Sequence, residues 1–216
     1  FGTLLISCGI LFAGMISLIL FLSCMRTKNK MKFEVRNEIL LNLGIFSLLI
    51  AIWSLDQCGF MQFLVPDGRT LYYIDFFSFL LFPIPFTFLI HDICKSKYRK
   101  GVMCLSILFM VNIALEVILQ CAGIIDIFQL LSVTHILMMF SVIYTFIIIH
   151  YEAVKLENRA AREFKYPVYI IMTFGVMEML MYYIRDFKKT SIFLPLGTLI
   201  FIISLIWIQV YRFYDQ

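Results

Sequence analysis

Residues 41–93 read LNLGIFSLLIAIWSLDQCGFMQFLVPDGRTLYYIDFFSFLLFPIPFTFLIHDI, and this stretch decides the fold. It holds two long apolar runs separated by a short polar loop, DQCGFMQFLVPDGRT. A helix needs ~20 apolar residues to cross a bilayer, and Trp and Tyr side chains prefer the headgroup boundary. Trp53 lies near the end of the first run, and Tyr72 and Tyr73 open the second. The stretch is therefore predicted to form a transmembrane helical hairpin.

Two prolines, Pro83 and Pro85, interrupt the second run near its middle. Proline lacks a backbone N–H, and a membrane helix tolerates it only where neighbouring helices or water satisfy the freed carbonyl. We therefore expect a kinked helix packed inside a bundle, with Pro83 and Pro85 acting as a hinge.

The composition excludes an ordinary soluble domain. Of the 216 residues, 62% are hydrophobic and 17% aromatic, and the mean hydropathy is +0.94. Soluble domains are about 45–50% apolar. A membrane β-barrel would show alternating segments of ~10 residues, whereas the apolar runs here are continuous and of helix length. The predicted fold class is all-α: a polytopic membrane protein forming a seven-transmembrane helix bundle.

Seven spans can be placed on the chain, which we interpret as one domain over residues 1–216. The spans cover approximately residues 2–25, 39–55, 71–93, 101–121, 128–151, 167–184 and 192–211. The segment at residues 151–167, YEAVKLENRAAREFKYP, consists mostly of good helix formers. We expect it either to form a solvated helical loop or to extend the fifth span beyond the membrane and to end at Pro167, because proline disfavours a helical conformation of the residue before it.

The basic residues define an orientation. Of the 18 Lys and Arg residues, 14 fall in alternate connections or after the last span: Arg26, Lys28, Lys30, Lys32, Arg36, Lys95, Lys97, Arg99, Lys100, Lys155, Arg159, Arg162, Lys165 and Arg212. The other side holds Arg69, Arg185, Lys188 and Lys189. The positive-inside rule then predicts an outside N-terminus and a cytoplasmic C-terminus. Because the basic residues lie beside spans, a nucleic-acid partner is not expected.

Ionisable residues inside spans are costly and usually face the bundle interior. Several recur at helical spacing, such as Asn112, Glu116 and Gln120, so they share one helix face. We predict an outward-opening ligand site, walled by Met177, Met181, Phe76 and Phe77 and lined by the following residues: Trp53, Asp56, Asp75, Asn112, Glu116, Gln120, His135, Glu178 and Tyr182. The alternative is that these side chains only hydrogen-bond neighbouring helices.

No metal site or cofactor is predicted. Glu116, His135 and Glu178 are of the ligand types that zinc uses, but the spacing does not fix their mutual distance. The six cysteines include no CxxC pair. Cys58 and Cys121 both lie near the outer face and could form a disulfide, which spacing alone leaves open.

Several enzyme classes are not expected, because the residues that they require are missing. The seventh span has no Lys for a retinal Schiff base, and no GxSxG, HExxH or phosphate-binding glycine loop is present. The segment is therefore predicted to be non-catalytic.

The run LGIFSLLIAIWSLDQCGFMQFLVPD, with the Tyr-rich start and the LFPIPFTFLI helix that follow it, resembles a bacterial family. It is similar to the membrane part of seven-transmembrane receptors with diverse intracellular signalling modules, especially those fused to GGDEF diguanylate cyclase domains in Firmicutes. The seven-span layout extends the resemblance over nearly the whole chain, and the detailed match covers Leu41–Ile93.

The resemblance implies a sensor in the bacterial cytoplasmic membrane that responds to a small ligand or to the state of the bilayer. It further implies a cytoplasmic output module after Gln216, most often a diguanylate cyclase and otherwise a histidine kinase or phosphatase. A homodimer would form through that module.

Two other classes compete with the sensor. A small transporter or permease would use the intramembrane carboxylates to relay protons or ions. No internal repeat supports an inverted-repeat transporter. A receptor of the animal type would carry a DRY-like triplet where this chain reads HDICKSKYRK.

Overall fold

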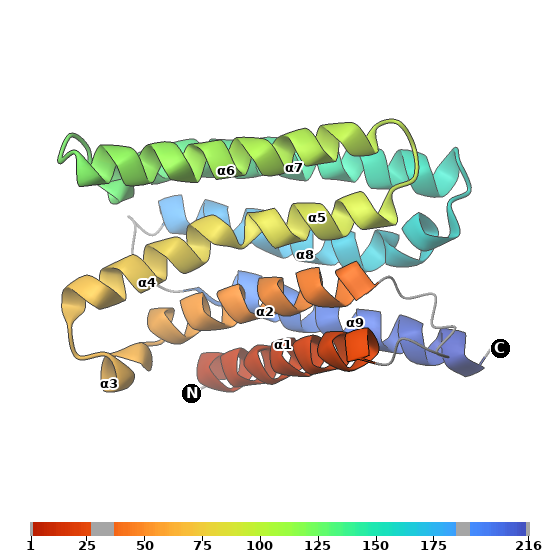
Figure 1. Cartoon of the computed structure of the whole chain (residues 1–216), viewed down its shortest axis with the longest axis horizontal. Helices are drawn as coiled ribbons and strands as arrows, with labels where there is room; N and C mark the ends of the chain where they lie inside the picture. Colours follow the sequence, from red (N-terminus) through yellow and green to blue (C-terminus); the bar gives the residue numbers. More distant parts are fainter. Residues whose placement is uncertain (1, 27–36, 185–190, 215–216) are drawn as a thin grey trace.

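The computed structural model of the chain describes residues 2–26, 37–184 and 191–214, which form helices joined by short turns (Figure 1). The helices are α1 (Gly2–Arg26), α2 (Asn37–Gln57), α3 (Met61–Leu64), α4 (Gly68–Leu81), α5 (Pro83–Ile93), α6 (Arg99–Cys121), α7 (Ile127–Val154), α8 (Arg159–Ile184) and α9 (Phe193–Tyr214). The prediction of an all-α fold is confirmed for the described residues.

Six helical segments in the described ranges are long and apolar enough to cross a membrane. They are the greater part of α1 and α2, the α4–α5 pair at Gly68–Ile93, and all of α6, α7 and α8. The seventh predicted span corresponds to α9. Its segment Phe193–Ile208 is an apolar helix that is shorter than the six segments above. These helices are typical of a multi-pass membrane protein.

The long helices form a closed ring. Each contacts its successor in the order α1, α2, α5, α6, α7, α8 and α9, and α9 contacts α1. Contacts of α2 with α9, and of α5 with α8, cross the ring. Successive long helices run antiparallel, so α1 begins at one end of the bundle and α9 ends at the other (Figure 1).

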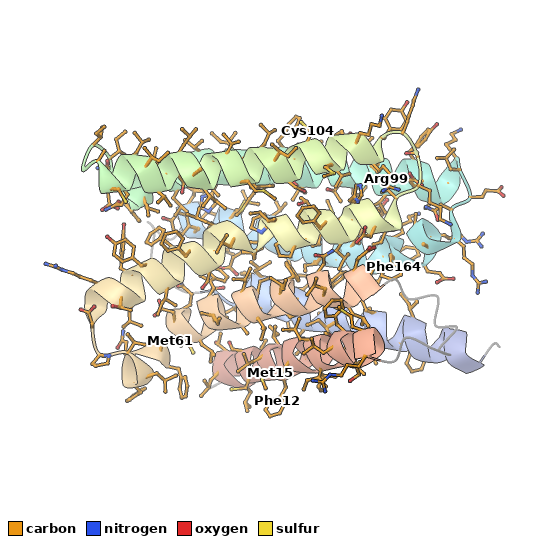
Figure 2. All side chains as sticks on the ribbon, in the orientation of Figure 1. Phe12, Met15, Met61, Arg99, Cys104 and Phe164 are labelled. Carbon is orange, nitrogen blue, oxygen red and sulfur yellow. The ribbon has the colours of Figure 1, made fainter. Side chains whose placement is uncertain are left out.

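The two ends of the bundle differ in charge. One end, here called the basic end, holds the α5–α6 and α7–α8 connections and the following residues: Arg26, Lys95, Lys97, Arg99, Lys100, Lys155, Arg159, Arg162 and Lys165 (Figures 1 and 2). The opposite end, here called the α3 end, holds α3 and Arg69. The other basic residues used to predict orientation lie outside the described residues, except Arg212 near the end of α9.

Small residues allow α1 and α2 to pack closely. A Cβ atom on Gly14 would lie 3.2 Å from the Gly44 carbonyl oxygen and 3.1 Å from the Ser47 Cβ. The Ser7 and Ser54 hydroxyls lie 2.6 Å apart across the same interface. Because lipid removes the hydrophobic drive for helix association, close packing and buried hydrogen bonds of this kind stabilise the pair.

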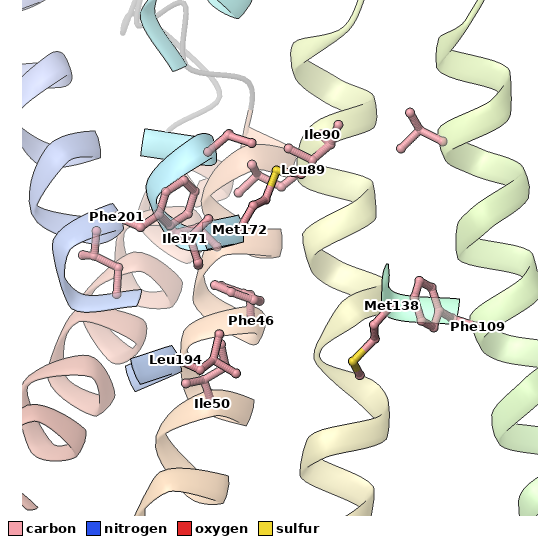
Figure 3. Close-up of a cluster of buried hydrophobic side chains, with 14 of the residues drawn as sticks. Phe46, Ile50, Leu89, Ile90, Phe109, Met138, Ile171, Met172, Leu194 and Phe201 are labelled. Carbon is pink, nitrogen blue, oxygen red and sulfur yellow. The ribbon is translucent and has the colours of Figure 1, made fainter. Parts of the chain in front are cut away.

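The outer surface of the bundle is apolar, as a membrane protein requires. On α1, large hydrophobic side chains such as Phe12 and Met15 point away from the other helices (Figure 2). Inside the ring, Phe46 of α2 is fully buried in the hydrophobic core (Figure 3). Its ring centroid lies 5.4 Å from that of Phe86 and 6.4 Å from that of Phe201. Phe46 thereby joins α2, α5 and α9 at the centre of the bundle.

The helix that contains Pro83 and Pro85 is interrupted at Phe82, between α4 and α5. Neither proline can donate a hydrogen bond to the preceding turn. The Phe86 N–H reaches the Phe82 carbonyl with a donor–acceptor distance of 3.4 Å. Both prolines are buried. The interruption therefore lies within protein, where a break in a membrane helix is tolerated.

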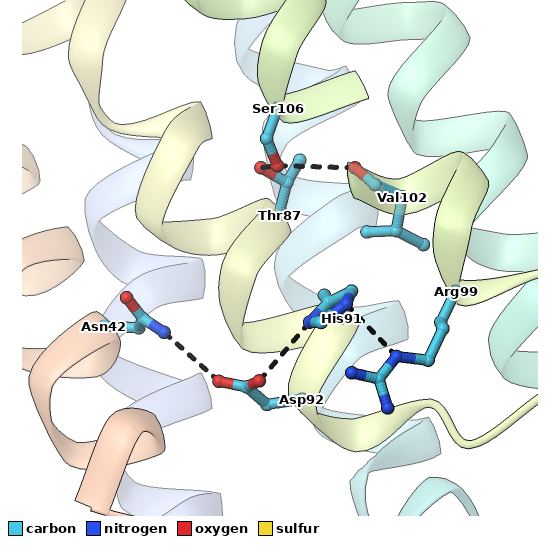
Figure 4. Close-up of polar contacts among 7 residues, drawn as sticks. All are labelled: Asn42, Thr87, His91, Asp92, Arg99, Val102 and Ser106. Carbon is cyan, nitrogen blue, oxygen red and sulfur yellow. Dashed lines mark hydrogen bonds and ion pairs between the residues drawn. The ribbon is translucent and has the colours of Figure 1, made fainter. Parts of the chain in front are cut away.

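Polar contacts hold α5 against α2 and α6 (Figure 4). The hydroxyls of Thr87 and Ser106 lie 2.7 Å apart in the buried α5–α6 interface. Nearer the basic end, the Asn42 side-chain amide donates to Asp92 at 3.3 Å, and the Arg99 Nε–H donates to His91 at 3.1 Å. These contacts fix the half of the broken helix that lies beyond the prolines.

The expected extension of the fifth span to Pro167 is wrong. Helix α7 ends at Val154, and α8 starts at Arg159 with Pro167 inside it. Glu157 adopts a left-handed conformation with φ of 49°, which ends the helical path. The Asn158 side chain then accepts a hydrogen bond from the Ala160 N–H at 3.2 Å and caps the new helix.

A buried carboxylate ties the two connections at the basic end together. Glu152 is fully buried, and its Oε1 accepts hydrogen bonds from the N–H groups of Lys95 at 3.1 Å and Ser96 at 2.7 Å. Its Oε2 accepts from the Asn158 amide at 2.8 Å, and the same amide donates to the Ile93 carbonyl at 3.0 Å. The α5–α6 connection is thereby held against the α7–α8 turn.

Substitution of Glu152 should destabilise the bundle. In Glu152→Gln the new amide would face the Asn158 amide, donor against donor, and we expect a loss of about 1–3 kcal/mol in the free energy of unfolding. Glu152→Ala should lose about 3 kcal/mol or more, because the N–H groups of Lys95 and Ser96 and one N–H of the Asn158 amide would lose their acceptor. Denaturant unfolding in detergent micelles measures both, with the exposed Glu157→Gln as the control; equal stability of all three variants would contradict this role.

Candidate functional site

A partly open cavity of about 300 Å³, here called the central cavity, lies within the ring of helices. A volume of ~300–1,000 Å³ is typical of small-molecule sites. Its walls come from α2 and from every longer helix from α4 to α9, and they are mainly apolar. The lining residues include Trp53, Gln57, Tyr72, Asp75, Phe76, Phe79, Pro83, His135, Ser141, Gly175, Glu178, Met181 and Tyr182.

Aromatic rings make up much of the wall, and they contact one another. The Trp53 and Phe79 ring centroids are 5.4 Å apart, and Phe79 lies 5.5 Å from His135 in an edge-to-face arrangement. The His135 ring in turn lies 5.2 Å from that of Tyr182. Helices α2, α4, α7 and α8 thus meet through a continuous chain of rings at the cavity.

Three polar side chains from different helices enter this aromatic wall: Gln57, Asp75 and His135. Asp75 of α4 is buried, and its Oδ1 accepts a hydrogen bond from the Gln57 amide of α2 at 2.9 Å. His135 of α7 is also buried, and its Nδ1 lies 3.0 Å from the Tyr183 hydroxyl of α8. A mainly apolar cavity with a few convergent polar groups has the general form of a ligand pocket.

Glu178 lines the cavity, but its carboxylate has a structural partner. Its Oε2 accepts hydrogen bonds from the N–H groups of Phe193 at 2.8 Å and Leu194 at 3.0 Å. These are the first residues of α9, whose N–H groups have no acceptor within the helix. Glu178 of α8 therefore caps α9, and a negative charge at this position is favoured by the helix dipole.

The predicted face of α6 does not reach the central cavity. Glu116 is 2% exposed, and its Oε1 accepts hydrogen bonds from the Asn112 amide at 2.7 Å and the Thr134 hydroxyl at 2.5 Å. These contacts join α6 to α7 laterally. The second Glu116 oxygen has no hydrogen-bond partner among the described residues. Gln120 accepts from the Ile127 N–H at 2.8 Å and so closes the α6–α7 turn.

The structure therefore divides the predicted site residues into two groups. The residues that line the central cavity are Trp53, Asp75, His135, Glu178 and Tyr182, together with the wall residues Phe76 and Met181 and the predicted hinge residue Pro83. The residues that lie elsewhere are Asp56, Asn112, Glu116, Gln120, Met177, Phe77 and Pro85.

The cavity wall continues toward the α3 end through Tyr72. The Tyr72 hydroxyl donates to the Asp126 carboxylate, which also accepts from the Phe128 N–H at 2.9 Å and caps α7. Tyr72 additionally borders a second hollow at this end, formed with Arg69, Gln120 and other residues. Tyr72 thus separates the central cavity from this outer hollow.

Neither a metal site nor a disulfide connects the candidate residues. No group of three or more His, Cys, Asp or Glu side chains suited to a metal ion occurs in the part of the chain that the structure describes. Glu116 and Glu178 instead have the partners given above. Cys58 and Cys121 are both free and exposed, so the disulfide left open by their spacing is not formed.

Sequence reasoning missed several lining residues for which a pattern was available. Gln57 lies four residues after Trp53 and shares its helix face. Ser141 lies six residues after His135, with Met138 between them at helical spacing, and all three line the cavity. The contact of Thr134 with Glu116 could not be predicted from spacing, because it depends on how α6 and α7 pair.

No protein-family model, curated protein or solved structure matches the chain. The functional proposal therefore depends on the geometry of the central cavity.

Removing the Glu178 cap should act on stability. Glu178→Ala leaves two N–H groups at the start of α9 without an acceptor, and we expect a loss of about 1–2 kcal/mol in the free energy of unfolding. Glu178→Gln keeps an acceptor oxygen and should lose about half as much, because a neutral hydrogen bond is weaker than a charge-assisted one. Denaturant unfolding in micelles measures both; an unaltered Glu178→Ala protein would contradict the cap.

Proposed function

We propose that the chain is the membrane sensor of a bacterial signalling protein and that the central cavity binds its small ligand. The observation that carries the proposal is the cavity itself: a largely aromatic cavity of about 300 Å³ at the centre of a helix ring, with polar groups from α2, α4 and α7 in its wall. A receptor requires only that the helix ring adopts two conformations that bind the ligand with different affinity.

The broken helix supports a route for the signal. Pro83 lines the cavity directly beside the interruption at Phe82, so a ligand would contact the α4–α5 segment at its interruption. Phe86, one turn further along α5, contacts Phe201 of α9 at a centroid distance of 6.4 Å. A shift at the break would then move α9, the helix that leads toward the C-terminus.

The charge distribution supports the proposed orientation. The basic end carries the end of α1, the α5–α6 and α7–α8 connections and the end of α9, which the positive-inside rule assigns to the cytoplasm. With α9 as a seventh span, the chain begins outside and ends inside. The resemblance described above then favours a diguanylate cyclase as the output module after α9, acting as a homodimer.

The transporter alternative receives less support. A proton or ion relay needs carboxylates that follow one another along a path. Here Glu116 pairs with α7 side chains away from the cavity, and Glu178 caps α9. Uptake of a solute by proteoliposomes containing this chain alone would nevertheless favour the transporter over the sensor.

Filling the cavity tests the proposed binding role. Ser141→Leu places a larger apolar side chain in the cavity wall, whereas Ser204→Leu makes the same change on α9 at a position that does not line it. We expect members of a panel of cationic, neutral and anionic benzene derivatives to raise the thermal unfolding midpoint of the native chain and of Ser204→Leu in nanodiscs, since ligands stabilise the state they bind. Ser141→Leu should lose this effect. A shift retained by Ser141→Leu, or absent for the whole panel, would contradict the proposal.

Cysteine labelling tests the orientation. A membrane-impermeant maleimide added outside cells should label the exposed Cys58 and Cys121 at the α3 end. Burial raises the pKa of the Cys94 thiol to about 12, helped by the nearby Glu152 carboxylate, so little thiolate exists at pH 7 and Cys94 should stay unlabelled. A Lys97→Cys variant should react only after the cells are opened. Labelling of Lys97→Cys, but not Cys58 and Cys121, in intact cells would reverse the orientation.

A further inference from the structure

A cluster of basic and aromatic side chains lies between α7 and α8 at the basic end, outside the central cavity. The Tyr169 hydroxyl of α8 lies 3.3 Å from the Nδ1 of His150 on α7. The Lys165 Nζ lies 5.9 Å from the centroid of the Tyr169 ring and 5.3 Å from that of Tyr166. These four side chains are here called the α7–α8 cluster. We propose that it binds the phosphate headgroup of an anionic phospholipid.

Three side chains of the cluster can donate hydrogen bonds to a phosphate. An ammonium group such as that of Lys165 is always a donor, and the Tyr169 hydroxyl and an imidazole N–H of His150 can donate as well. Hydrogen bonds from a charged donor to a phosphate oxygen are about twice as strong as those between neutral groups. Within the ranges that the structure describes, no carboxylate forms an ion pair with Lys165.

The charges around the cluster favour an anion. Arg162 is exposed and lies three residues before Lys165, so both basic side chains share one face of α8. Two carboxylates of this end are engaged with other groups. Glu163 accepts a hydrogen bond from the Nε–H of Arg159 at 2.9 Å, and Glu152 is buried and accepts from backbone N–H groups of the α5–α6 connection.

An apolar surface continues from the cluster toward the middle of the bundle. Ile143, Phe146, Ile147 and His150 follow one another at helical spacing and share one face of α7. The three apolar side chains are each about half exposed. The Phe146 ring also stacks on that of Tyr169, with 4.4 Å between the centroids. An acyl chain would lie along this face below its headgroup, which a free phosphate ion would not use.

The cluster lies at the depth that lipid headgroups occupy. His150 is four residues before the end of α7 and Lys165 six residues after the start of α8, about 6 Å and 9 Å along the helix axes. Basic pockets between membrane helices on the cytoplasmic side typically bind anionic headgroups. Convergence of donors from two helices distinguishes the cluster from a single Lys or Tyr that only anchors a helix at the interface.

The same end of the bundle provides a matched control. The Lys97 Nζ lies 5.4 Å from the centroid of the Tyr98 ring, in a pair like that of Lys165 and Tyr166. There the neighbouring Tyr144 hydroxyl donates to the Tyr98 carbonyl at 3.2 Å and is used within the protein. Lys97→Gln therefore removes a comparable charge without touching the cluster.

Native mass spectrometry tests the proposal. The purified chain in detergent micelles is mixed with equal amounts of a phosphatidylglycerol and a phosphatidylcholine that have the same acyl chains, and the lipid that is retained first is identified by its mass. A second series replaces part of the ammonium acetate buffer by ammonium phosphate at constant ionic strength.

We expect the native chain to retain phosphatidylglycerol at least fivefold more often than phosphatidylcholine. Lys165→Gln should lower the affinity for phosphatidylglycerol about fivefold, the usual contribution of one Lys near an anionic membrane surface, so that the two lipids are retained about equally. Lys165→Arg, which keeps the charge, and Lys97→Gln should both keep the preference of the native chain. Inorganic phosphate should not displace the lipid.

Three results would overturn the inference. Equal retention of both lipids by the native chain would show that the cluster does not select an anionic headgroup. An equal loss of preference in Lys97→Gln and Lys165→Gln would assign the effect to the total charge of the basic end. Displacement of the lipid by inorganic phosphate would make the cluster a site for the free anion. The test does not involve the central cavity, so it is independent of the binding role proposed above.

Discussion

Hydrocarbon offers no water to a backbone amide, and this constraint shapes the whole structure. Every spanning segment is a helix, and the one interruption among the described spans, at Phe82, is covered by the closed ring of helices. The central cavity lies beside this interruption, with Pro83 in its wall.

The polar side chains that contact other elements of the bundle have three distinct roles. Some satisfy helix ends and turns, as Glu178 does for α9, Asp126 for α7 and Glu152 for the connections at the basic end. Others join neighbouring helices, as Thr134 joins Glu116 across α6 and α7. The third group, which includes Asp75 and its partner from α2, borders the cavity.

The sequence was sufficient for what is local and periodic. Apolar run length predicted the helices, and proline chemistry predicted an irregular second helix in the opening hairpin. Composition could not show which helices pair side by side. Glu116 lies on a polar stripe of α6, and only the packing of α6 against α7 directs that stripe toward Thr134 and away from the cavity. Nor could spacing show that Glu178 caps a helix fifteen residues later. The turn at Glu157 was missed because the residues around it are good helix formers, and the Asn158 cap outweighed that preference.

The central claim is that occupancy of the cavity moves the two halves of the broken helix relative to each other. Spin labels at Thr70→Cys, near the start of α4, and at Lys97→Cys, just beyond α5, would measure their separation by pulsed electron resonance in nanodiscs. The exposed native cysteines would be replaced by serine. With a benzene derivative that raises the thermal unfolding midpoint of the native chain, the account predicts a changed distance distribution that Ser141→Leu abolishes. An identical distribution with and without bound probe would contradict it.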